Sequence, residues 1–168
     1  MAIIKRKGYG QVEPNHLSAQ RNGQIYAQLP CNKSITVLEN GQFVKYDYAN
    51  GECNFTGDGE WMLVINEVKT YDARETYKDF ALNADTMDMT PRVFKTNIGD
   101  IYTTNCLEKA GAKGQETVGT EDLNPETKLG INTAGFLSTK ITEGPIFQVV
   151  KVYTMPDGQQ GVKVMRIK

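Results

Sequence analysis

Histidine is almost absent from this sequence, and its scarcity removes the commonest general base. Among 168 residues, His16 is the only histidine, and the only serines are Ser18, Ser34 and Ser138. Ser18 lies two residues from His16, but no residue can be assigned as the orienting third member of a triad. No serine stands in a Gly-x-Ser-x-Gly motif. We therefore predict no catalytic residue, and expect His16 to be a polar residue that hydrogen-bonds locally.

Cysteine is also scarce. Cys31, Cys53 and Cys106 form an odd, widely spaced set. A zinc site needs about four Cys or His ligands at short paired spacings, which this chain does not offer. The pattern favours free thiols in a reducing compartment, packed as small apolar side chains.

Acidic residues are numerous, but their spacing defines no recognisable site. On a helix, Asp72, Glu75 and Asp79 would share a face and offer oxygen ligands, yet the twelve-residue calcium-loop pattern is missing. The glycines of residues 8–10 and 111–114 lack the strand-then-helix setting of a phosphate-binding loop. Sequence gives no carboxyl separation, so it does not support a glycosidase. We predict no metal and no cofactor.

Long apolar runs are missing, and net charge is low. The longest aliphatic run, residues 62–65, is too short to cross a bilayer, and no apolar stretch follows the charges of residues 1–7. We therefore expect neither a signal peptide nor a membrane partner. Residues 1–30 carry four basic residues and one acidic residue, whereas residues 31–90 carry five basic and eleven acidic residues. This asymmetry favours an orienting surface field over nucleic-acid binding.

Turn residues and β-type segments dominate what is present. Asn40-Gly41 is typical of a two-residue type I′ turn, which would pair Val37 with Val44 and Ile35 with Tyr46 across a hairpin. Such a hairpin has one apolar and one polar face, because side chains alternate along a strand. Further strands are expected at residues 24–29, 53–55, 60–68, 92–96, 100–105, 135–138, 145–153 and 161–167.

These segments predict an all-β, mainly antiparallel fold, either a β-barrel or a small β-sandwich. Residues 92–105 read as a second hairpin, and residues 155–158 as the turn of a C-terminal one. Residues 71–82 are the one helical candidate, with Asp72 as its cap. We expect an extended N-terminal arm over residues 1–24 and a β domain over 25–168. Within that domain, residues 108–140 would form a surface excursion, and Trp61 would anchor the core.

One resemblance rests on four stretches of sequence. They read RKGYGQVEPNHLSAQRNGQIYAQLP, LENGQFVKYDYANGECNFTGDGEWMLVINEVKTYD, PRVFKTNIGDIYTTN and GPIFQVVKVYTMPDGQQGVKV. Together they resemble small virion structural proteins of tailed bacteriophages, in particular those that coat or cement the capsid. The resemblance covers residues 5–105 and the C-terminal stretch, and residues 108–140 do not contribute to it.

The resemblance implies a non-enzymatic protein on the outer surface of the virion capsid, assembled in the bacterial host cytoplasm. Its partners would be the major capsid protein and further copies of itself, since such proteins commonly form trimers. Their extended arm often reaches across capsid subunits or into a neighbouring copy. Here the capsid-binding arm residues would be Ile3, Ile4, Lys5, Arg6, Lys7 and Tyr9.

Three alternatives remain open. The protein could belong to the tail, the baseplate or a head fibre of the virion. It could be a β-barrel that binds single-stranded nucleic acid through residues 5–9, with a steep salt dependence. In a third arrangement, residues 1–24 simply cap their own domain.

Overall fold

Antiparallel strand pairs form the sheets in the described part of the chain. The computed structural model describes residues 10–18, 28–66, 82–83, 89–110, 115–116, 123–141, 144–156 and 158–168. Over these residues, two main sheets contain six and four strands, and two further strand pairs accompany them. The sheets are not closed into a barrel, an arrangement consistent with a small β-sandwich. The all-β prediction is therefore confirmed.

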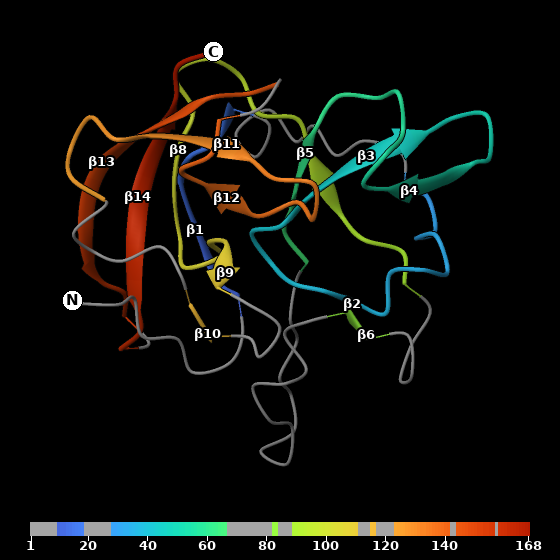
Figure 1. Ribbon diagram of the computed structural model, residues 1–168, viewed down its shortest axis with the longest axis horizontal. Helices are drawn as coiled ribbons and strands as arrows, with labels where there is room; N and C mark the ends of the chain where they lie inside the picture. Colours follow the sequence, from blue (N-terminus) through green and yellow to red (C-terminus); the bar gives the residue numbers. More distant parts are fainter. Residues whose placement is uncertain are drawn as a thin grey trace.

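The six-stranded sheet lies on the left of Figure 1 and the four-stranded sheet on the right. The six-stranded sheet has the order β1 (Val12–His16), β8 (Ile101–Thr104), β14 (Gln160–Arg166), β13 (Phe147–Thr154), β11 (Lys128–Ile131) and β12 (Leu137–Ser138). The four-stranded sheet has the order β4 (Glu52–Asn54), β3 (Phe43–Asp47), β5 (Met62–Val64) and β7 (Val93–Phe94). The separate pairs are β2 (Val37–Leu38) with β6 (Leu82–Asn83), and β9 (Lys109–Ala110) with β10 (Gln115–Glu116).

Both faces of the four-stranded sheet carry buried apolar side chains. Side chains alternate along its strands, so Phe43 and Leu63 enter one apolar cluster, while Val44 and Met62 enter another. The first cluster continues into the six-stranded sheet, where the Phe147 ring lies 5.5 Å from that of Phe43. Trp61, 7% exposed, belongs to this larger cluster. The prediction that Trp61 lies in the core is therefore confirmed.

A polar cluster also joins the two sheets. Arg166 on β14 lies 3.2 Å from a carboxylate oxygen of Glu60, next to β5, and the other oxygen lies 2.7 Å from the Lys95 ammonium. The Arg166 guanidinium also donates to the hydroxyl and the carbonyl of Thr96, which follows β7. Because Arg166 is only 13% exposed, this contact is better shielded from water than a surface ion pair.

The predicted hairpin around Asn40-Gly41 is wrong. The turn itself exists, since the Gln42 N–H donates to the Glu39 carbonyl. However, Gly41 has a φ of +94°, whereas Asn40 does not have a positive φ. One positive φ at the third turn position defines a type II geometry, which splays the flanking strands apart. Strand β2 therefore pairs with β6, and β3 pairs with β4 and β5.

The second predicted hairpin is wrong for a related reason. Gly99 has a φ of +91°, and the Asp100 N–H donates to the Asn97 carbonyl, so this turn too has a single positive φ. Strand β7 before it joins the four-stranded sheet, and β8 after it joins the six-stranded sheet. The turn thus carries the chain from one sheet to the other.

The C-terminal hairpin is confirmed. Strands β13 and β14 pair along most of their length, with a register shift near Val150. Their turn is closed by the Gly158 N–H, which donates to the Met155 carbonyl. β13 and β14 occupy the centre of the six-stranded sheet, where β14 also pairs with β8 and β13 with β11.

Several predicted segments lie wholly or partly outside the described residues. The expected helix falls there except for Leu82, which begins β6. Residues 24–27 of the first expected strand also fall there, and residues 28–29 form no strand. Of the segment expected to be an arm, residues 10–18 are described, and Val12–His16 form β1. The expected excursion over 108–140 contains β11 and β12, which extend the six-stranded sheet.

Candidate interface at the edge strand β1

The six residues predicted to bind a capsid, Ile3, Ile4, Lys5, Arg6, Lys7 and Tyr9, lie outside the described residues. The structure does describe the point at which they join the domain. After Gly10 and Gln11, strand β1 forms one edge of the six-stranded sheet, and β8 is its pairing partner among the described strands. His16 lies in this strand, opposite Ile101. We therefore take β1 and its contacts as the candidate interface.

The first described residues are held tightly by the domain. Gly10 is buried, and a Cβ on it would lie 2.4 Å from the Asn40 carbonyl oxygen, so no larger residue fits without movement. The next backbone N–H, that of Gln11, donates to the Asn105 side chain over 2.7 Å. Asn105 in turn donates to the buried Gln159 over 3.0 Å. The chain therefore enters β1 through a fixed position.

A tyrosine from β13 reaches across the sheet to β1. The Tyr153 hydroxyl donates to a Glu13 carboxylate oxygen, and lies 3.0 Å from the hydroxyl of Thr103. Thr103 donates to the Asn15 side chain over 2.8 Å, so the network returns to β1. Burial, and then the hydrogen bond to Glu13, raise the pKa of Tyr153 above its ordinary value. The tyrosine is therefore a neutral donor at physiological pH.

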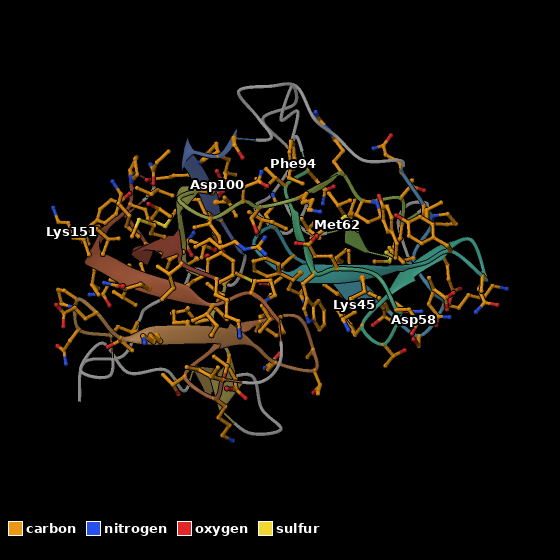
Figure 2. The ribbon with its side chains drawn as sticks, turned by 90° about the horizontal axis from the view of Figure 1, so that it is seen from above. Lys45, Asp58, Met62, Phe94, Asp100 and Lys151 are labelled. Carbon is orange, nitrogen blue, oxygen red and sulfur yellow. The ribbon has the colours of Figure 1, made fainter. Side chains whose placement is uncertain are left out.

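The far end of β1 is fixed by a buried carboxylate. Asp100 is 4% exposed and accepts hydrogen bonds from the Ser18 N–H and hydroxyl, both at 2.9 Å. The Asn97 N–H donates to it over 2.8 Å. Asp100 thus ties the residue after Leu17 to the turn between β7 and β8. Figure 2 shows Asp100 at the side of the six-stranded sheet that faces Phe94.

The outer face of the sheet next to Tyr153 is basic. The ammonium groups of Lys151 and Lys163 each lie 5.7 Å from the centre of the Tyr153 ring, within cation–π range. Lys151 lies at the end of the molecule remote from the four-stranded sheet (Figure 2). Lys163 pairs with Thr103 on one side and Lys151 on the other.

A small apolar cavity opens beside this network. It has a volume of about 180 Å³ and is lined by Gln11, Glu13, Met155 and Pro156. The second carboxylate oxygen of Glu13 is buried and finds no hydrogen-bond partner among the described residues. Pro14 lies in the middle of β1 and has no N–H for a further strand, a common way to protect a sheet edge. The edge is therefore poorly suited to pair along β1 itself.

Metal sites and membrane-spanning helices are both missing from the described residues. No group of three or more His, Cys, Asp or Glu side chains there is placed to hold a metal ion. Nor does any helix in that part of the chain have the length and hydropathy to cross a membrane.

Comparison with known proteins gives no relative. No family model matches the chain, and neither the curated proteins nor the solved structures contain a significant match.

Proposed function

We propose that this protein is a non-enzymatic structural protein of a tailed-phage virion. It would bind the outside of the capsid and stabilise the contacts between major capsid protein subunits. The sequence resemblance motivates the proposal, and the anchoring of β1 is the structural observation that best supports it. A segment that ties a domain to its neighbours has to be attached to a rigid point of that domain.

The contacts of β1 meet that requirement. An edge strand paired on one side is normally among the first elements to open. Here Gln11 is held at the beginning of β1, Glu13 in its middle and Ser18 beyond its end. A pull on residues 1–9 would therefore be transmitted to β8 and β13, and β1 would stay attached to the sheet.

The proposed arm carries Lys5, Arg6 and Lys7 next to apolar Ile3 and Ile4. Basic and apolar groups together suit a partner surface that is acidic with apolar depressions. Each single contact would be weak, but repetition over a lattice, with association of the copies into oligomers, gives avidity. A segment that becomes ordered on binding has to offset its ordering cost with such contacts.

Deletion of residues 1–8 tests the arm. The deletion ends before Gly10, the first described residue, and therefore leaves the contacts that hold β1 in place. We expect the shortened protein to keep its Tm and to lose at least tenfold in affinity for expanded, undecorated heads of its phage. Binding would be read by co-sedimentation.

Charge reversal at Lys5, Arg6 and Lys7 provides a second variant. Its matched control reverses three exposed lysines elsewhere, at positions 33, 140 and 168, so that net charge changes equally. Loss of head binding in the arm variant alone supports the proposal, and equal binding by both variants contradicts the role of the arm. Binding of a single-stranded oligonucleotide, lost in the arm variant alone and steeply salt dependent, would favour the nucleic-acid alternative.

A further inference from the structure

Cys31 and Cys53 lie side by side although 22 positions separate them in the sequence. Their sulfur atoms are 3.3 Å apart. Neither cysteine is part of a disulfide in this structure. The contact does not involve β1 or the proposed arm, and the proposed function does not use it.

The backbone holds the two cysteines in register. Residues 30–32 lie along the free edge of β4 and form a parallel bridge with it, centred on Cys31 and Cys53. The Cys53 N–H donates to the Pro30 carbonyl and the Asn32 N–H donates to the Cys53 carbonyl, both over 2.8 Å. Neighbouring strands are about 4.8 Å apart, which lies inside the Cα separation of disulfides. Closure therefore requires side-chain rotation and only a small backbone shift.

From this geometry we propose that Cys31 and Cys53 form a redox-active pair, which a disulfide oxidant of the glutathione type converts into an intramolecular disulfide. The bond would close a loop that contains β2 and β3, and would fasten β4 to the segment before β2. Cys106, which follows β8 in the other sheet, takes no part.

The two cysteines differ in a way that assigns their roles. Cys31 is half-buried, whereas Cys53 is fully buried within the second apolar cluster. The hydrogen bond between them lowers the pKa of Cys31, and the same contact together with burial raises that of Cys53. Cys31 is therefore the attacking thiolate and Cys53 the resolving one.

The reaction balances with glutathione disulfide as the oxidant. The Cys31 thiolate attacks one sulfur of glutathione disulfide, forms a mixed disulfide and releases one glutathione thiolate. The Cys53 thiolate then attacks the Cys31 sulfur and displaces the second glutathione. The protons of the two cysteine thiols pass to the two displaced glutathione thiolates, the two cysteines lose two electrons, and glutathione disulfide is reduced to two molecules of glutathione.

The test is refolding of the reduced, denatured full chain in a buffer of reduced and oxidised glutathione, so that access to Cys53 does not limit the reaction. The remaining free thiols are then trapped and counted in denaturant, and the disulfide is located from the masses of the peptides. We expect one free thiol in place of three, a peptide pair joined through Cys31 and Cys53, and a Tm higher by about 5–10 °C than that of the reduced protein.

Two variants complete the test. In Cys106→Ala, the thiols of Cys31 and Cys53 should still disappear on oxidation. In Cys31→Ser, the two remaining thiols should stay free, and the oxidant should not change the Tm. If Cys106→Ala does not fold, the peptide map of the unmodified chain gives the answer. Three free thiols in the folded protein, a stable glutathione adduct, or a disulfide to Cys106 would each overturn the proposal.

Discussion

Replacement of Asp100 with alanine should loosen β1, because the Asp100 side chain holds Ser18, two residues beyond the end of this strand. The carboxylate is 4% exposed and accepts three hydrogen bonds, two from Ser18 and one from Asn97. Hydrogen bonds to a charged group contribute about 1.5–3 kcal/mol each. Ser18 and Asn97 are accessible enough to regain water, so only part of that sum is lost. We expect a loss of about 3 kcal/mol, or a Tm lower by roughly 6–12 °C.

Urea unfolding followed by tryptophan fluorescence measures this loss, because Trp61 lies in the cluster shared by both sheets. Asp58→Ala is the matched control, since Asp58 is an exposed aspartate (Figure 2) at which we expect a change within about 0.5 kcal/mol. Hydrogen exchange should show faster exchange in β1 of the Asp100 variant. An Asp100 variant as stable as the control would refute the argument that this carboxylate anchors β1.

Three further changes follow from single observations. Tyr102→Phe should raise stability by about 1 kcal/mol, since the Tyr102 hydroxyl is buried and no described residue forms a hydrogen bond with it. Stability should fall as the pH rises above about 10, because the pKa of Tyr153 is higher in the folded protein than in the unfolded chain. The stability that Tyr153 contributes is complete below its unfolded-state pKa and is lost when the hydroxyl ionises beside Glu13. Gly41→Ala should cost about 3 kcal/mol or more, since φ is +94° and the new Cβ would lie 2.5 Å from the Thr104 hydroxyl.

Denaturant unfolding checks all three, each against its own reference. A destabilised Tyr102→Phe would mean that the hydroxyl is satisfied by water. Between about pH 8 and pH 11, the unfolding free energy of Tyr153→Phe should fall less with rising pH than that of the unmodified protein. An equal fall in both proteins would contradict the role assigned to Tyr153. Gly51→Ala is the control for Gly41, because φ is +67° there but no atom lies within 4 Å of the new Cβ. Equal losses at both glycines would show that the close contact at Gly41 is unimportant.

The fold class follows from the sequence, because turn residues and period-2 alternation are local properties. The C-terminal hairpin could be predicted for the same reason, since its turn and both strands are adjacent in the chain. The partners of β2 and β7 could not. An Asn-Gly or Gly turn signal is compatible with more than one turn type, and the type decides whether the flanking strands pair or separate. Here packing selects the type II form, in which Gly41 lies against Thr104 of the other sheet.

The anchoring network could not be predicted for a different reason. Tyr153 and Glu13 are 140 positions apart, and Ser18 and Asp100 are 82 apart. Nothing in the local sequence marks a tyrosine in a strand as a donor to a distant carboxylate. Ser18, two residues from His16, is of a residue type that serves as a nucleophile, whereas in the structure its hydroxyl donates to Asp100. The pairing of Cys31 with Cys53 likewise depends on the path of residues 28–32 along β4.

In the proposed function, this protein occupies a repeated position on a capsid. The most direct test measures how many copies of the purified full chain co-sediment with each major capsid protein subunit of expanded, undecorated heads. Capsid decoration predicts saturation at a fixed ratio set by a lattice position. A handful of copies per head, or none, would contradict decoration and favour a position in the tail or a head fibre.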